Sequence, residues 1–232
     1  MRKIAVICAK ELRVYFGSIA GYLIVTAFLA MSGIAFFHWT DQYRTSSMRP
    51  IFQIMAVLVL LTAPAITMRL LAGEFSSKTS DLLFTSRITP LQIILGKFLF
   101  CVCVLIVMLV CTCQFPLLLL KYGSPDMGQM LSGYIGLILA GSLFCAIGLF
   151  ASSTTSNTAI AAVIAIGILL GLFLLPSGGQ DSDTAIAVLS PFTHFGSFAK
   201  GVFDTADAAY FILGALAFVL ATTQVLRLRR RS

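Results

Sequence analysis

The sequence predicts an all-α integral membrane protein with six transmembrane helices, and three observations lead to this fold class. Hydrophobic residues make up 59% of the 232 residues, above the about 45–50% that is usual in soluble domains. Six apolar runs are long enough to cross about 30 Å of hydrocarbon at about 1.5 Å per helical residue. None of the runs alternates apolar and polar residues as the strands of a membrane barrel do. We therefore expect residues 1–232 to form a single helical membrane domain.

Residues 1–17 are predicted to form an interfacial helix ahead of the first span. Apolar side chains recur along one stripe of this helix and basic side chains fall toward the other, a pattern typical of helices that lie flat on a membrane surface. The apolar stripe holds Ile4, Cys8, Leu12 and Tyr15, and the basic residues are Lys3, Lys10 and Arg13. The alternative is that this segment only flanks the first span.

The six spans follow in order along the chain. They are expected at about 19–37, 51–68, 95–120, 131–150, 158–175 and 208–226. Pro64 in the second span predicts a kink, because proline lacks the N–H that a helix interior needs. Gly167 and Gly171 in the fifth span have the G-x-x-x-G spacing that lets helices approach closely. This pair is predicted to lie either at a dimer contact or at a contact within the bundle.

Basic residues are distributed unevenly over the segments that connect the spans. Twelve of the 16 fall on one predicted side: Arg2, Lys3, Lys10, Arg13, Arg69, Lys78, Arg87, Lys97, Arg227, Arg229, Arg230 and Arg231. The positive-inside rule places this side, with both termini, in the cytoplasm. The net charge of +7 thus follows from membrane topology, and nucleic acid is not expected as a partner.

The interiors of the six runs are predicted to be free of Asp, Glu, Lys, Arg and His; Lys97, at the edge of the third run, is counted with the cytoplasmic residues between the second and third spans. Proton-coupled carriers and intramembrane enzymes depend on such groups. We therefore expect no catalytic residue, metal site or cofactor in this chain. If the bundle moves a solute, the work must come from another protein.

The segment 73–98 carries five charged residues, although only 11% of the whole chain is charged. Its Lys78-Thr79 pair has some likeness to a phosphate-binding loop. That loop requires the pattern G-x-x-x-x-G-K-[ST], with a glycine directly before the lysine, and Ser77 stands there instead. ATP binding by this segment is not expected.

A structural role fits this segment better. Residues 74–86 are predicted to form a short cytoplasmic helix, and Thr89-Pro90-Leu91-Gln92 to form a capping box that opens the third span. In a capping box the threonine and the glutamine each satisfy an unpaired backbone N–H of the helix start. Such a turn would join the short helix rigidly to the membrane helix.

The outer segment 176–207 begins polar and then becomes apolar without reaching the length of a span. We expect two short helices that dip into the outer leaflet, with Ser190 capping the second and Pro191 at its first position. The segment is predicted to act either as an outer gate or as an apolar lid on the bundle. The candidate gate residues are Ser190, Pro191, His194, Phe195 and Phe198.

Two blocks of sequence resemble the ABC-2 type permeases, in the branch of the gliding-motility and nitrous-oxide-reductase-maturation permeases. The first block matches at Pro64, Thr67, Met68, Arg69, Glu74, Thr79, Leu82, Leu83, Thr85, Gly96 and Lys97. The second block matches at Ser190, Pro191, His194, Phe195, Phe198, Gly201 and Asp204. The chain departs from the family pattern at Lys78, where a glycine is frequent, and at Arg87, where a proline is common.

The resemblance implies a type V exporter-like permease subunit in a bacterial inner membrane, in contact with membrane lipids. Two permease copies, identical or related, would form the pathway, and separate ABC ATPase subunits would bind ATP and Mg. An auxiliary subunit with an extracytoplasmic domain is common among the gliding-motility relatives. The coupling helix that seats in the ATPase would use Glu74, Phe75, Lys78, Thr79, Asp81, Leu82, Leu83 and Arg87.

Two alternatives from other functional classes stay open at this stage. One is a gradient-driven carrier or channel, which would transport without an ATPase. The other is a structural or mechanical membrane anchor of an ATPase complex, which would move no solute.

Overall fold

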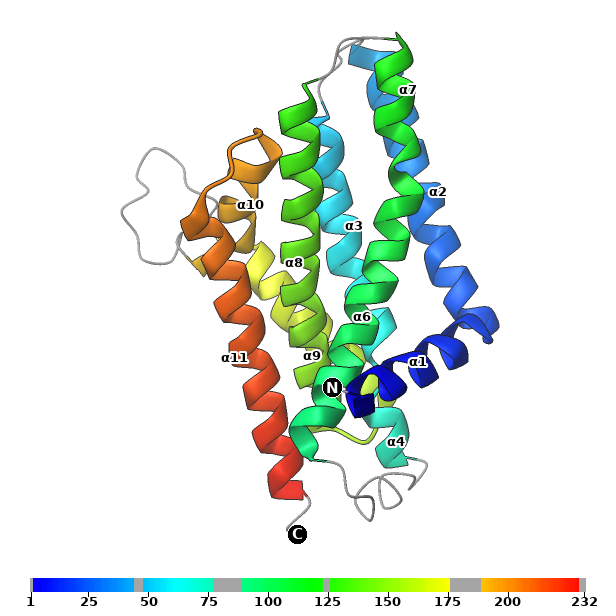
Figure 1. The fold of residues 1–232 in the computed structure, drawn as a ribbon, viewed down its shortest axis with the longest axis vertical. Coiled ribbons are helices and arrows are strands. Elements are labelled where there is room, and N and C mark those ends of the chain that lie inside the picture. Colours follow the sequence, from blue (N-terminus) through cyan, green and yellow to red (C-terminus); the bar gives the residue numbers. More distant parts are fainter. Residues whose placement is uncertain (1, 44–47, 77–88, 123–125, 176–188, 230–232) are drawn as a thin grey trace.

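The computed structural model describes residues 2–43, 48–76, 89–122, 126–175 and 189–229, and all of its secondary-structure elements are α-helices (Figure 1). They are α1 (Arg2–Phe16), α2 (Ile19–Tyr43), α3 (Arg49–Thr67), α4 (Ala72–Ser76), α6 (Pro90–Thr112), α7 (Gln114–Tyr122), α8 (Met127–Thr154), α9 (Thr158–Phe173), α10 (Pro191–Ala199) and α11 (Thr205–Arg229). The all-α prediction is confirmed for the described part of the chain.

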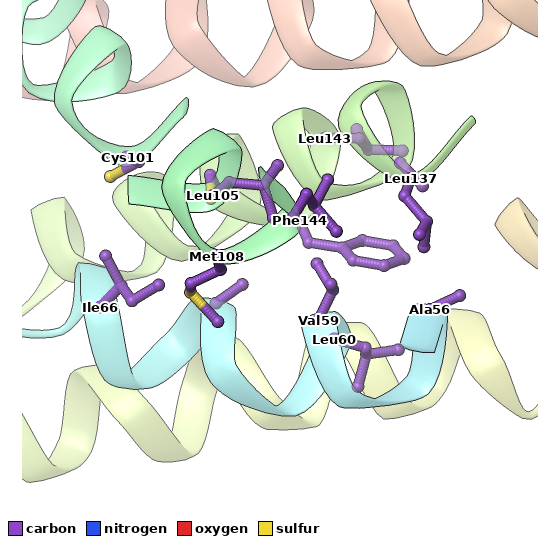
Figure 2. Close-up of a cluster of buried hydrophobic side chains, with 14 of the residues drawn as sticks. Ala56, Val59, Leu60, Ile66, Cys101, Leu105, Met108, Leu137, Leu143 and Phe144 are labelled. Carbon is purple, nitrogen blue, oxygen red and sulfur yellow. The ribbon is translucent and has the colours of Figure 1, made fainter. Parts of the chain in front are cut away.

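The helix α8 lies at the centre of the bundle, where it contacts α3, α6, α9, α10 and α11. Figure 2 shows part of this core, with Val59 of α3, Leu105 and Met108 of α6 and Phe144 of α8 packed together. A β-carbon at Gly136 would lie 2.6 Å from the β-carbon of Phe198 in α10. Small residues on α8 therefore bring its neighbours into close contact, as is usual between membrane helices.

Five stretches of the described chain are long and apolar enough to cross a membrane. They are Ile19–Thr40, Arg49–Ser76, Pro90–Lys121, Met127–Thr154 and Thr205–Arg229. The fifth predicted span, 158–175, corresponds to α9, an apolar helix of 16 residues, which is about 24 Å long and short of the hydrocarbon thickness. The other five predicted spans are thus confirmed as helices of membrane length, and the fifth stays a prediction.

The boundaries of several helices differ from the predicted runs. The third run is divided into α6 and α7 by a turn at Cys113. The last helix begins at Thr205 and continues to Arg229, beyond the predicted 208–226, because backbone hydrogen bonds hold polar terminal residues in the helix after the apolar run has ended. Apolar runs therefore locate the spans but not the ends of the helices.

The two ends of the described chain lie at the same end of the bundle as α4, and α1 lies across this end (Figure 1). The predicted apolar stripe of α1 is confirmed: Cys8 is buried, and Leu12 and Tyr15 pack against the core. A β-carbon at Gly96 would lie 2.8 Å from the Ile7 β-carbon and 3.2 Å from the Ile4 carbonyl oxygen. The glycine therefore allows α1 to cross α6 at close range.

Candidate functional site

One lysine is buried inside α6, and this corrects the prediction that the apolar runs hold no charged residue. The side chain of Lys97 is only 1% exposed. Lys97 lies close to the predicted start of the third run, where a cytoplasmic position is expected, but α6 already begins at Pro90. Burying an ammonium group costs free energy unless it is paired and hydrogen-bonded, so its partners determine what this residue does.

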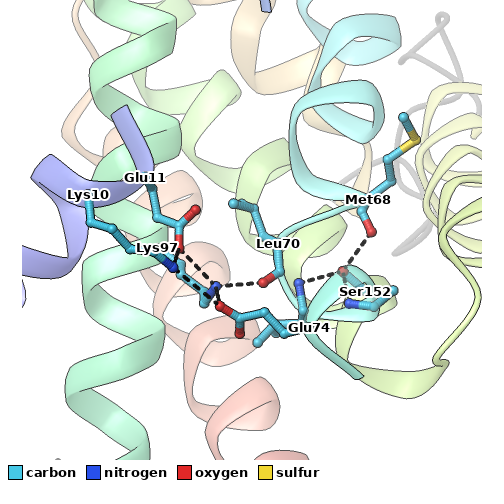
Figure 3. Close-up of polar contacts among 9 residues, drawn as sticks. Lys10, Glu11, Met68, Leu70, Glu74, Lys97 and Ser152 are labelled. Carbon is cyan, nitrogen blue, oxygen red and sulfur yellow. Dashed lines mark hydrogen bonds and ion pairs between the residues drawn. The ribbon is translucent and has the colours of Figure 1, made fainter. Parts of the chain in front are cut away.

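The ammonium group of Lys97 donates three hydrogen bonds to three different segments (Figure 3). Its Nζ lies 2.6 Å from the carbonyl oxygen of Leu70, 2.7 Å from Oε1 of Glu74 and 3.3 Å from Oε1 of Glu11. These three bonds match the three protons of a lysine ammonium. Lys97 therefore joins α6 to α1, to α4 and to the turn that follows α3.

The charges around Lys97 balance. The carboxylates of Glu11 and Glu74 are 12% and 16% exposed. Lys10, which is 59% exposed, lies 3.2 Å from Glu11 and 4.0 Å from Glu74. Two ammonium groups thus face two carboxylates, which offsets the desolvation of the buried lysine.

Ser152 of α8 holds the turn between α3 and α4 from the other side. Its Oγ accepts hydrogen bonds from the backbone N–H groups of Leu71, at 3.2 Å, and Ala72, at 3.0 Å, and donates to the carbonyl oxygen of Met68 at 3.1 Å. Figure 3 shows these bonds next to those of Lys97. We call Glu11, Leu70, Glu74, Lys97 and Ser152 the Lys97 junction.

The end of α11 also contacts α4. The Arg229 guanidinium carbon lies 4.6 Å from the centre of the Phe75 ring, a cation–π contact. The same guanidinium donates a hydrogen bond to the carbonyl oxygen of Thr154 at 2.6 Å. The short helix α4 is therefore held by side chains from α1, α6, α8 and α11.

The predicted coupling residues divide into two groups. Glu74 and Phe75 lie in α4, where both make the contacts described above. The others lie outside the described residues: Lys78, Thr79, Asp81, Leu82, Leu83 and Arg87. The predicted helix 74–86 is seen only as its first part, within Ala72–Ser76.

The predicted capping box at the start of α6 is confirmed. The backbone N–H of Gln92 donates to the Thr89 hydroxyl at 3.4 Å, and the backbone N–H of Thr89 donates to the Gln92 side-chain oxygen at 3.3 Å. Pro90 occupies the first turn. The start of α6 is therefore fixed two turns before Lys97.

Sequence reasoning missed four residues of this site: Glu11, Lys97, Ser152 and Arg229. Lys97 had a usable signal, since an ionisable residue inside an apolar run marks a functional site by default. Ser152 had none, because a serine in a membrane helix is ordinary.

The outer segment is confirmed in part. Ser190 precedes α10 and Pro191 stands at its first position, as predicted, but the Ser190 hydroxyl makes no capping hydrogen bond. The Nδ1 of His194 lies 2.6 Å from Oδ1 of Asp207, and the His194 ring stacks on Tyr210 with the ring centres 4.2 Å apart. The predicted helix before Ser190 lies outside the described residues.

The candidate gate residues are mostly buried at the end of the bundle opposite α4 (Figure 1). Ser190, Pro191, Phe195 and Phe198 are buried, and His194 is partly exposed. This packing suits a lid, and the gate role stays a prediction.

Gly167 and Gly171 lie on an open face of α9. A β-carbon at either position would meet no atom within 4 Å among the described residues. The described part of the chain thus contains no close helix contact at this G-x-x-x-G spacing.

A comparison with models of known protein families gives a match. The family model described as ABC-2 family transporter protein matches residues 16–179, which is more than half of the 232 residues. No curated protein matches the chain. The matched region contains Leu70, Glu74, Lys97 and Ser152 of the junction.

Proposed function

Because the chain belongs to the ABC-2 transporter family, we propose that it is the permease subunit of an ATP-driven exporter. Its family and its apolar helices make it a membrane protein. Membership of this family implies association with ABC ATPase partners in general. ATP and Mg would bind to those separate subunits, and this chain would carry no enzymatic activity.

The Lys97 junction is the observation that supports coupling to a partner. The segment 73–98 would seat in an ATPase subunit on the cytoplasmic side of a bacterial inner membrane. Closure of the ATPase dimer would displace α4, where Glu74 lies 2.7 Å from the Lys97 ammonium. Hydrogen bonds to a charged group are strong and require a defined distance and angle, so α6 and α1 would follow α4.

Ser152 connects α4 to the centre of the bundle as well. Its hydroxyl bonds both N–H groups at the start of α4, and it lies on α8, which contacts α3, α6 and α11. Movement of α4 would therefore reach the helices that form the pathway. A displacement of α4 would thus be passed to α6 through the Lys97 bonds and to α8 through the Ser152 bonds.

A second permease copy would complete the pathway. The open glycine face of α9, at Gly167 and Gly171, supports this because it leaves space for close approach of another helix. We propose a homodimer or a related heterodimer with both termini in the cytoplasm. An auxiliary subunit on the outer face would be an addition to this core.

One sequence argument against the gradient-driven alternative is lost, since Lys97 is a charged residue inside a span. Its position nevertheless favours a structural role. The ammonium group is 1% exposed and already donates to Leu70, Glu74 and Glu11, so loss of its proton would remove the positive charge that pairs with both carboxylates and would break the junction.

The proposal is tested by purifying the tagged chain in mild detergent from its native membrane. We expect ABC ATPase subunits and ATP hydrolysis to co-purify with the wild-type chain. The double variant Leu82→Asp, Leu83→Asp should lose both, because charge at these positions would disrupt an apolar docking surface. The variant Ser80→Asp is the matched control, since it adds a charge to the same segment without removing an apolar side chain.

An ATPase that remains bound and active with the Leu82→Asp, Leu83→Asp variant would contradict docking through this segment. Transport by the purified chain in liposomes without any ATPase would overturn the proposed function itself.

A further inference from the structure

A cavity of about 230 Å³ lies beside the Lys97 junction, between α1, α2 and the end of α3. We call it the α1–α3 cavity; Glu11, Tyr15, Ile24, Ile66, Arg69 and Phe100 are among the residues that line it. It exceeds the about 150 Å³ that accommodates a benzene molecule in a protein interior. It is too small for a whole lipid, so it would take one end of such a molecule.

Two polar groups of this cavity lack partners among the residues that the structure describes. The exposed side chain of Arg69 makes no hydrogen bond or ion pair there. The Tyr15 hydroxyl is buried without a hydrogen-bond partner, and burial raises the pKa of this phenol to about 12. The Tyr15 hydroxyl therefore keeps its proton at physiological pH and can donate a hydrogen bond, and a ligand with acceptor atoms would satisfy both groups.

The charge around the cavity favours an anion. The carboxylate of Glu11 also lines it, but this group already accepts from Lys97 at 3.3 Å and from Lys10 at 3.2 Å. The positive charge of Arg69 has no such counterpart within the described chain. An incoming anion would complete the pairing of Arg69, whereas an incoming cation would have to compete with two lysines for Glu11.

Most of the remaining lining residues are apolar, and exposed apolar side chains of α2 adjoin them in sequence. Ile24, Ile66 and Phe100 line the cavity, and Ile19 and Leu23 of α2 are 87% and 66% exposed beside it. Basic pockets between membrane helices on the cytoplasmic side bind anionic lipid head groups. The combination of an unpaired arginine, a buried donor and apolar walls is what a phosphate with attached acyl chains requires.

We propose that the α1–α3 cavity binds the phosphate-bearing end of an anionic phospholipid. The phosphate pairs with Arg69, an oxygen near it accepts a hydrogen bond from Tyr15, and the acyl chains lie along α2. This site goes beyond the proposed function and does not depend on an ATPase. Since Glu11 and Leu70 line the cavity and also contact Lys97, a bound lipid braces the junction.

The test measures the rise in the thermal unfolding midpoint of the purified, delipidated full chain as phosphatidylglycerol or phosphatidylethanolamine is added in detergent. We expect phosphatidylglycerol to bind more tightly than phosphatidylethanolamine. Arg69→Gln should weaken phosphatidylglycerol binding about tenfold or more, and Tyr15→Phe about threefold to tenfold, from the loss of a charged and a neutral hydrogen bond. Arg227→Gln is the matched control, because Arg227 is exposed at the same end and lines no part of this cavity.

Three results would overturn the proposal. They are equal affinity for the two lipids, an equal loss of binding in Arg227→Gln and Arg69→Gln, or full competition by soluble glycerol phosphate at the same concentration as the lipid. The last result would indicate a site for free phosphate. If Arg69→Gln fails to fold, the affinity of Tyr15→Phe for phosphatidylglycerol is compared with that of Arg227→Gln. An equal loss of affinity in these two variants would overturn the proposal.

Discussion

The two ends of the bundle are held together by different interactions. At the end with α4, a single ammonium group that is 1% exposed makes hydrogen bonds of 2.6, 2.7 and 3.3 Å to three other segments. At the other end, α10 is held mainly by the buried rings of Phe195 and Phe198. The polar contacts of α10 include the pair His194–Asp207 and a hydrogen bond of 3.2 Å from Gln129 of α8 to the Ala199 carbonyl oxygen.

This difference separates an end held by hydrogen bonds to a buried charge from an end held mainly by apolar packing. Hydrogen bonds to a charged group require a defined distance and angle, whereas apolar burial is non-directional. The end with α4 is therefore suited to pass on a displacement, and the end with α10 to keep the bundle closed. The variants below test this comparison, from the largest expected effect to the smallest.

Lys97→Met is expected to have the largest effect. It leaves the carboxylates of Glu11 and Glu74 facing each other without their buried partner, which should lower the free energy of unfolding by about 4 kcal/mol. The measurement is denaturant unfolding of the purified chain in detergent. Lys200→Met, at an exposed lysine of the opposite end, is the control and should change stability by less than about 0.5 kcal/mol.

Phe198→Ala probes the apolar end in the same assay. The side chain is 0% exposed, so the loss of its contacts and the cavity left behind should cost about 3 kcal/mol. Phe37→Ala, at a ring that is 73% exposed, is the control. If Phe198→Ala also abolished co-purification of an ATPase while the chain stayed folded, the division between the two ends would be wrong.

Ser152→Ala tests the second attachment of α4. It leaves the buried N–H groups of Leu71 and Ala72 without their acceptor, which should cost about 2 kcal/mol. Ser153→Ala is the control, because that buried hydroxyl bonds only to the carbonyl oxygen of Phe150 in its own helix. Equal losses in the two variants would show that the turn does not depend on Ser152.

Gly96→Ala should have the smallest effect of the set. Its new methyl group would lie 2.8 Å from the Ile7 β-carbon and would push α1 away from α6, at a cost of about 1–2 kcal/mol. Gly167→Ala is the control, since nothing lies within 4 Å of that position among the described residues. A stable Gly96→Ala variant in which protease cleavage of α1 is no faster than in wild type would contradict this close crossing.

Local sequence patterns predicted the elements of the fold well. The apolar stripe of α1, the capping box at Thr89 and Gln92 and five of the spans depend on residues a few positions apart, where periodicity and helix-end chemistry apply. The helix ends were less accurate, because backbone hydrogen bonding continues past the apolar residues.

The contacts within the Lys97 junction could not be predicted from local sequence patterns. Lys97 meets Glu11 across 86 positions of sequence and Glu74 across 23, and such pairings depend on how the helices pack. The presence of a charge in the third run was visible in the sequence, but the identity of its partners was not. Likewise, the spacing of Gly167 and Gly171 indicated close approach without showing that their face of α9 is open.

The most direct test of the account is a double-mutant cycle between Lys97→Met and Glu74→Gln, measured as free energies of unfolding in detergent. If Lys97 holds α4 through Glu74, whose Oε1 lies 2.7 Å from its Nζ, the double variant should be no less stable than Lys97→Met alone. The interaction energy should then reach about 2 kcal/mol, within the range found for residues in direct contact. Losses that add to within about 0.5 kcal/mol would show that the two residues act independently and would contradict the junction.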